Sequence, residues 1–240
     1  MPKNHLIIDE GNTQCKAAII EDGQIVARCT ITDTFDAQLV EFIAGKIIAK
    51  IITSSTRQSV VKLPAMLDGV PHIAMSANLK LPIKLNYETP QTLGTDRIAA
   101  AVGANYLYPN QNTLIIDIGT AITIDFLNAD GVFQGGIISP GPEMRAKALN
   151  HFTGKLPLVS ITETANLQGK NTIEALQFGI INGINFEILG YIKKYHEIVN
   201  NLNVIVTGGA SHLFNTEEFN AKLEPDLVLL GMNYLLEKNI

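Results

Sequence analysis

The stretch LIIDEGNT at residues 6–13 decides the fold, because a close copy of it, LIIDIGTAIT, stands at residues 114–123. With the same shift along the chain, Asp22-Gly23 falls on Asp130-Gly131 without a gap. Each copy reads as an apolar strand that ends in Asp-x-Gly, then a second strand, an Asp-Gly hairpin turn and a third strand. The Asp-Gly pair indicates a hairpin because both central residues of a type I′ turn need positive φ. The repeat therefore predicts two similar halves, each beginning with a β-meander.

Alternating helical and strand patterns follow each meander, which is typical of a mixed sheet with flanking helices. We expect an α/β protein with two similar lobes and a cleft between them. The boundary is predicted near Tyr108-Pro109-Asn110, which gives lobes of residues 1–110 and 111–240. The predicted elements after the meanders are helices at 36–48, from Thr95 onward, near 142–150, at 172–200 and at 226–238, and strands at 51–56 and 204–209.

Composition argues against several classes of function. The chain has 240 residues, of which 46% are hydrophobic, so it can bury a substantial core. Its net charge is -5 and it has no Lys/Arg-rich run, which disfavours a nucleic-acid partner or an anionic membrane surface. The N-terminus lacks a signal-peptide pattern, and no apolar run approaches the ~18 residues of a membrane span. We therefore expect a cytoplasmic protein.

The two cysteines, Cys15 and Cys29, flank the first Asp-Gly turn. If that turn is a two-residue loop, Cys15 faces Thr30 rather than Cys29. Neighbouring positions on a strand point to opposite faces, so a disulfide between the two cysteines is disfavoured. We expect two free thiols.

The turns DEGNT at 9–13 and DIGTAIT at 117–123 have the composition of anion-binding turns. Glycine lets backbone amides approach an anion, and hydroxyl residues follow it. Asp9 and Asp117 cannot hold phosphate directly, but each can hold a hydrated Mg²⁺ or a monovalent cation that bridges to it. A single Asp-x-Gly would more simply close a turn, and the second copy favours a phosphate site. Thr207-Gly208-Gly209 is a weaker signal for a turn that packs against a nucleotide base or ribose.

The segment LGTDRIAAAVGANYLY at 93–108 has helical spacing, with Thr95 placed to cap its start. Asp96 then lies in the first turn, where the helix dipole keeps a carboxylate ionised. An ionised Asp can accept a proton from an alcohol as it attacks phosphorus, and Arg97 can pair with a carboxylate or a developing phosphate charge. The alternative is an acid that only complements the dipole, beside a surface arginine.

Six sequence elements follow one another along the chain: DEGNT, Tyr87 with Pro90 and GTDR at 94–97, DIGTAIT, GGIISPG at 135–141, GKNT at 169–172 and VIVTGG at 204–209. In order and spacing, and over essentially the whole chain, they resemble the type III pantothenate kinase family. The superfamily of acetate and sugar kinases, Hsp70 and actin contains this family, which implies an actin-like, ribonuclease H-like duplication.

The resemblance implies an ATP-dependent transferase that phosphorylates pantothenate to 4'-phosphopantothenate, the first step of coenzyme A biosynthesis. It implies Mg²⁺ with ATP, a K⁺ (or NH₄⁺) ion, and a homodimer that binds pantothenate near the subunit interface. Asp96 is implied as the proton acceptor and Asp117 as the K⁺ ligand. The implied ATP-binding residues are Asp9, Gly11, Asn12, Thr13, Lys16 and Thr120, and the implied pantothenate-binding residues are Tyr87, Gly94, Thr95, Asp96, Arg97 and Thr172.

Glu10 departs from the family pattern, which has an apolar residue after the first Asp. Strand alternation points Glu10 away from the face of Asp9 and into a layer that should be buried, where an unpaired carboxylate is costly. A cationic partner, exposure at a subunit edge and a weakened ATP site are the three outcomes left open.

Two other functions compete with this interpretation. One is a kinase of the same superfamily that acts on another small molecule, for which Tyr87 and Thr172 are the discriminating residues. The other is a non-catalytic nucleotide-binding regulator, against which Asp96 argues. An Hsp70-like or actin-like switch is disfavoured because this length leaves no room for their extra subdomains.

Overall fold

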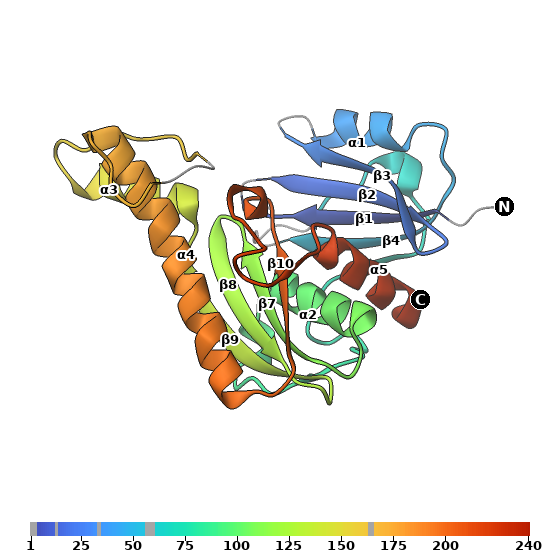
Figure 1. Ribbon diagram of the computed structural model, residues 1–240. Coiled ribbons are helices and arrows are strands. Elements are labelled where there is room, and N and C mark those ends of the chain that lie inside the picture. The colour runs from blue at the N-terminus through green and yellow to red at the C-terminus, as the bar shows by residue number, and fades with distance from the viewer. Residues whose placement is uncertain (1–3, 13, 33–34, 56–60, 163–165) are drawn as a thin grey trace. The chain divides into compact units, whose positions relative to one another are not determined.

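The computed structural model describes residues 4–12, 14–32, 35–55, 61–162 and 166–240. The chain forms two compact units (Figure 1). The first unit contains Met1–Leu107 together with Leu227–Ile240, and the second contains Tyr108–Asp226. The predicted division at residue 110 placed the last helix with the second half, whereas in the structure this helix belongs to the first unit.

The first unit is built on a five-stranded sheet in the order β3-β2-β1-β4-β5. The central strand β1 is antiparallel to β2 and parallel to β4, so the sheet is mixed. The strands are β1 (Asn4–Glu10), β2 (Cys15–Glu21), β3 (Gln24–Ile31), β4 (Ile48–Ser55) and β5 (His72–Ala74). The other elements are α1 (Phe35–Ile43), η1 (Ala65–Leu67), β6 (Lys84–Leu85), η2 (Pro90–Thr92), α2 (Thr95–Leu107) and α5 (Leu227–Asn239).

Successive side chains of β1 point to opposite faces of the sheet, and each face is covered by a different helix. Leu6 and Ile8 pack in one core cluster with Leu39 of α1. His5 lies on the opposite face, where its Nδ1 is 2.8 Å from Asn233 Oδ1 of α5. Asp9 has the same parity as His5, so it shares the face that α5 covers.

Helices α2 and α5 lie side by side (Figure 1) because glycines let their backbones approach. A Cβ at Gly231 would collide with the carbonyl oxygen of Ala99, and one at Gly103 would collide with that of Leu227. This packing is the physical reason why α5, the last helix of the chain, belongs to the first unit although the rest of that unit is far away in sequence.

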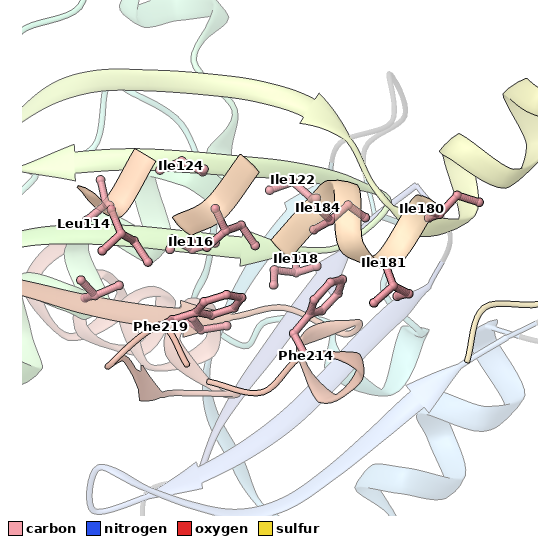
Figure 2. Close-up of a cluster of buried hydrophobic side chains, with 14 of the residues drawn as sticks. Leu114, Ile116, Ile118, Ile122, Ile124, Ile180, Ile181, Ile184, Phe214 and Phe219 are labelled. Carbon is pink, nitrogen blue, oxygen red and sulfur yellow. The ribbon is translucent and has the colours of Figure 1, made fainter. Parts of the chain in front are cut away.

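The second unit repeats the plan, with strands in the order β11-β10-β7-β8-β9. Its central strand β7 is antiparallel to β8 and parallel to β10. Buried isoleucines of β7, β8 and α4 form its core with Phe214 and Phe219 (Figure 2). The elements are β7 (Asn112–Ile118), β8 (Ala121–Leu127), β9 (Val132–Pro140), α3 (Pro142–Phe152), α4 (Thr172–Ile198), β10 (Leu202–Thr207), η3 (Ser211–Leu213) and β11 (Lys222–Leu223).

The α/β class and the two mixed sheets with flanking helices are therefore confirmed, as are the helices and strands predicted after the meanders. Most boundaries move by a few residues, although the helix predicted at 36–48 already ends at Ile43. None of the described helices is long and apolar enough to cross a membrane.

The two hairpins differ, although both contain Asp-Gly. In the first, Asp22 and Gly23 have φ of 49° and 78°, as a two-residue turn with two positive φ angles requires. In the second, β8 ends at Leu127 and the loop has four residues, with positive φ at Gly131 and not at Asp130. The side chain of Asn128 holds this longer loop by accepting hydrogen bonds from the backbone of Asp130 and Val132.

The predicted partner of Cys15 was wrong. A register irregularity between Ile19 and Ile20 moves the pairing by one residue, so Cys15 lies opposite Ile31 and Cys29 lies opposite Ala17. The extra residue of a bulge cannot be read from the turn alone. Both cysteines are nevertheless free thiols, as expected.

Candidate active site

Asp9 is the penultimate residue of strand β1 and lies on the α5 side of the first sheet. Its Oδ1 is buried and accepts no hydrogen bond from the described part of the chain. Burial, and after it the charge of Asp96, raise the pKa of Asp9 to about 6, against the opposing effects of a hydrogen bond from Ser54 and of the Lys16 ammonium. A buried carboxylate oxygen without a donor is costly unless a cation or another ligand meets it.

Asp96 lies in the first turn of α2, as predicted. Its Oδ1 accepts a hydrogen bond of 2.8 Å from the backbone N–H of Arg97. The residue before the helix is Gly94, whose carbonyl accepts from the N–H of Ile98 at 3.1 Å. A Cβ at Gly94 would collide with Asp96 Oδ1, so glycine leaves the space that this carboxylate occupies.

Thr95 does not cap the helix, contrary to the prediction. It is the first helical residue, and its Oγ1 is 3.0 Å from Oγ of Ser54 at the end of β4. The cap position falls on Gly94 because the first helical hydrogen bond starts from its carbonyl. The Thr95 hydroxyl therefore ties α2 to the sheet.

Arg97 is buried, with 6% of its surface exposed, which contradicts the alternative of a surface arginine. Its guanidinium carbon lies 5.8 Å from the centroid of the half-buried Tyr87 ring. A guanidinium stacked on an aromatic face keeps its fork of N–H donors pre-oriented for a carboxylate or a phosphate. Tyr87 and Arg97, both implied to bind pantothenate, are thus brought together.

The first of the two turns predicted to bind phosphate follows β1. The N–H of Gly11 donates to the carbonyl of Gln14 at 2.9 Å, which closes the turn, and Asn12 is exposed. Lys16 lies opposite Asp9 in the antiparallel register of β1 and β2. Thr13, implied as an ATP contact, lies outside the described residues.

Glu10 has a hydroxyl partner on the neighbouring strand β4. The Oγ of Ser55 donates to Glu10 Oε2 at 2.7 Å, and Glu10 is half-buried. Ser55 is also the register partner of Glu10 between β1 and β4. The carboxylate is therefore hydrogen-bonded, which offsets part of the cost of its burial.

In the second unit the turn after β7 is closed by the N–H of Gly119, which donates to the carbonyl of Ala121 at 2.9 Å. The N–H of Gly141, from the GGIISPG segment, donates to the carbonyl of Thr120 at 3.1 Å. Asp117 is half-buried and Thr120 is exposed.

The Thr-Gly-Gly segment packs against this same turn. Gly208 has a φ of 98°, and a Cβ there would collide with Asp117 Oδ1 and with the backbone of Ile118. The N–H of Ala210 donates to the carbonyl of Ile118 at 2.9 Å. Glycine at 208 therefore supports the Asp117 turn, in addition to any contact with a nucleotide that its sequence suggested.

Thr172 is exposed at the first residue of α4. The helix start is fixed by a reciprocal pair of caps: Asn171 Oδ1 accepts from the N–H of Glu174 at 3.0 Å, and Glu174 Oε2 accepts from the N–H of Lys170 at 2.8 Å. The GKNT segment thus builds a rigid helix start that presents Thr172 to solvent.

No group of three or more His, Cys, Asp or Glu side chains suited to a metal ion occurs in the ranges that the structure describes. A cation at Asp9 or Asp117 would therefore depend on one carboxylate together with backbone carbonyls, water or phosphate oxygens, as Mg²⁺ at nucleotide sites commonly does. The orphaned Oδ1 of Asp9 fits such a cation.

Ser54 is the site residue that the sequence analysis missed. It lies beside Asp9 because β1 and β4 are parallel and their carboxyl ends meet at one edge of the sheet. The hydroxyl that follows the apolar run of β4 was a signal for it, but only the strand order makes β4 the neighbour of β1.

Comparison with known proteins agrees with this geometry. Residues 5–194 match the model of the type III pantothenate kinase family. A type III pantothenate kinase of Cytophaga hutchinsonii is 41% identical, covering 98% of this chain and 100% of its own length. One from Phocaeicola vulgatus is 39% identical, with 98% of both chains covered.

Solved structures show the same fold. A protein of Campylobacter jejuni assigned to the Baf family of transcriptional activators superposes with a TM-score of 0.64 at 22% identity, with 98% of both chains covered. The activator of the 2-hydroxyisocaproyl-CoA dehydratase from Clostridium difficile, solved with bound ADPNP, superposes with a TM-score of 0.52 at 15% identity, with 100% of this chain and 96% of its own covered. The chain belongs to the type III pantothenate kinase family, whose members phosphorylate pantothenate in coenzyme A biosynthesis.

Proposed function

We propose that this chain transfers the γ-phosphoryl group of ATP to the primary hydroxyl of pantothenate, with Asp96 as the proton acceptor. The proposal rests on one observation: Asp9, near the end of β1, and Asp96, at the start of α2, lie close together. The two carboxylates are close enough for the charge of Asp96 to raise the pKa of Asp9. Family membership supplies the substrate.

Phosphoryl transfer proceeds through a loose transition state, so the protein contributes position and charge neutralisation more than covalent chemistry. The pantothenate oxygen forms a bond to the γ-phosphorus while the bond from that phosphorus to the bridging β,γ-oxygen breaks and ADP leaves. The hydroxyl proton passes to the Asp96 carboxylate. The dipole of α2 and the backbone N–H of Arg97 hold that carboxylate in place.

Cations would complete the ATP site. The buried Oδ1 of Asp9 would hold Mg²⁺ or one of its water ligands, and the ion would supply positive charge to the nucleotide phosphates. Asp117, with the carbonyls of its turn, would hold K⁺ or NH₄⁺. Gly11, Asn12, Thr13, Lys16 and Thr120 are the further proposed ATP contacts.

For pantothenate we propose contacts from the residues around Asp96 and from Thr172. The stacked guanidinium of Arg97 is suited to the pantothenate carboxylate. Tyr87 would cover the ligand. Gly94, which has no side chain, and the hydroxyl of Thr95 would lie close to the reacting hydroxyl. Thr172 is a further proposed contact.

A homodimer is the proposed assembly, and the cytoplasm stays the predicted location. Exposed apolar side chains on β9 and α4 support a second copy as the partner, since Ile138, Ile173 and Phe186 are 66%, 53% and 61% exposed. Light scattering after size exclusion should give twice the chain mass of 26.1 kDa. A monomer at micromolar concentration would contradict the dimer.

The test of the function is a coupled assay of ADP release with pantothenate, Mg²⁺ and ATP, with and without K⁺. Wild type should turn over only with pantothenate and should be activated by K⁺, and Asp96→Asn should lose at least ~10²-fold in kcat, the usual contribution of a general base. Absence of turnover in wild type at high ATP would reject the assignment and favour another acceptor or a regulatory role.

A further inference from the structure

Ser54 lies between the two halves of the proposed catalytic centre. It is the register partner of Asp9 across β1 and β4, and it is only 1% exposed. Its hydroxyl donates to the Asp9 carboxylate and also lies 3.0 Å from the hydroxyl of Thr95, next to Asp96. One buried hydroxyl therefore contacts both the strand that carries Asp9 and the helix that carries Asp96.

The direction of these hydrogen bonds follows from the chemistry of the groups. An ionised carboxylate can only accept, and a serine hydroxyl has one proton to donate. When Asp9 is ionised, Ser54 therefore donates to Asp9, and Thr95 donates to Ser54. Oδ1 of Asp9 accepts nothing from the described residues, so this bond falls on the other carboxylate oxygen and leaves Oδ1 for a cation.

We infer that Ser54 is a positioning residue of the kinase reaction, which fixes the Asp9 carboxylate for Mg·ATP and locks it to the first turn of α2. The inference rests on the proposed function. Ser54 is buried beneath the site, so its effect passes through Asp9 and Thr95. Small errors in the placement of such groups cost much of the rate of a reaction that depends on alignment.

The next residue provides a matched control. Ser55 forms the same type of bond to Glu10, from the same strand and one register step further on. Adjacent strand residues point to opposite faces, so Ser55 lies away from the face of Asp9. Removing its hydroxyl deletes an equivalent hydroxyl–carboxylate bond outside the proposed catalytic machinery.

The experiment compares Ser54→Ala, Ser54→Cys, Ser54→Thr and Ser55→Ala with wild type in full-length protein. We expect Ser54→Ala to lower kcat roughly 10- to 100-fold, the loss typical of one hydrogen bond to a charged group. Its KM for pantothenate should change less than about threefold, and the half-saturating Mg²⁺ concentration should rise. Ser54→Thr keeps the donor and should recover most of kcat, whereas Ser55→Ala should retain wild-type kcat.

Thermal unfolding of each variant separates position from stability. If Ser54→Ala fails to fold, Ser54→Cys decides, because it keeps the volume and replaces a strong donor by a weak one. A Ser54→Cys enzyme with wild-type kcat, or a loss shared equally by Ser55→Ala, overturns the inference.

The two proposals fail in different ways. If wild type shows no pantothenate-dependent turnover, the proposed function fails. The positioning role of Ser54 is then tested by calorimetry, which measures the affinity for Mg·ATP. Weaker binding in Ser54→Ala but not in Ser55→Ala supports the positioning role, and equal binding rejects it.

Discussion

At the scale of single residues, the ionised carboxylate of Asp9 is unfavourable because it is buried. Its carboxylate has one buried oxygen that receives no hydrogen bond from the described residues, and it feels the charge of a second carboxylate, Asp96. Such an arrangement costs stability in the free protein and is typical of a site that is completed by a ligand. Because this cost depends on whether Asp9 is ionised, it can be measured as a change of protein stability with pH.

The pKa of Asp9 rises from 3.8 to about 6 on folding, so the folded state holds this proton more tightly than the unfolded state does. The resulting stabilisation is complete below pH 3.8 and is lost as pH rises towards 6. Above pH 6 the ionised side chain costs roughly 2–3 kcal/mol, at about 1.4 kcal/mol per pKa unit. Without Mg²⁺ or nucleotide, Asp9→Asn should therefore raise Tm by several degrees at pH 8 and by almost nothing at pH 4.

Differential scanning calorimetry across this pH range measures the effect. Asp130→Asn, at an exposed loop residue, is the matched control and should leave Tm unchanged at both ends. A lower Tm for Asp9→Asn at pH 8 would show that the carboxylate stabilises the free fold.

Arg97 yields a second prediction at this scale. Arg97→Lys keeps the charge but loses the planar fork and the stacking on Tyr87. We expect KM for pantothenate to rise at least ~10-fold, with a smaller change in kcat, because a bidentate contact to the bound acid is lost. Arg28→Lys, exposed on β3, should behave as wild type. Equal KM values for Arg97→Lys and wild type would favour another acceptor substrate.

At the scale of elements, helix packing in the first unit depends on glycines, which have no side chain, where α2 and α5 meet. Gly231 of α5 meets the backbone of Ala99 on α2, and there is no flexible side chain at that contact that could move aside. The start of α2 carries Asp96, so the position of α5 bears on the site through α2.

Gly231→Ala should destabilise the protein by about 2–3 kcal/mol, since overpacking against backbone forces the helices apart. Gly190→Ala, on an exposed part of α4 with nothing within 4 Å of the added Cβ, should be neutral or stabilising by up to ~1 kcal/mol. Chemical denaturation of both variants measures the difference. Equal stabilities would mean that α2 and α5 separate without cost.

At the scale of the whole molecule, the chain leaves the first unit after Leu107 and returns to it at Leu227. A ligand that binds the folded state and not the unfolded state stabilises the fold by mass action. Ligand binding should therefore be visible as a change in the stability of the entire protein.

Mg·ATP at about 100 times its Kd should stabilise wild type by about 2.7 kcal/mol, which a thermal shift assay detects as a higher Tm. Asp9→Asn should lose most of this gain, because it has no ionised carboxylate to hold the cation. The Asp130→Asn control should keep the full shift. A ligand-induced shift in Asp9→Asn as large as that of wild type would remove Asp9 from the ATP site.

The sequence by itself determined the duplicated meander, the α/β class, most elements and the family. These follow from local patterns, namely apolar periodicity, Asp-Gly turns and ordered motifs, which are present in the chain before it folds. It also placed Asp96 in the first turn of a helix, because helix starts have their own residue preferences.

Only the tertiary structure decided the rest. The bulge that moved Cys15 opposite Ile31, the burial of Arg97 and the return of α5 to the first unit all depend on contacts between residues far apart in sequence. Ser54 became a site residue for the same reason: strand order makes β4 the neighbour of β1, and no local pattern records that order. Short-range preferences fix what each segment becomes, whereas long-range packing fixes which side chains meet.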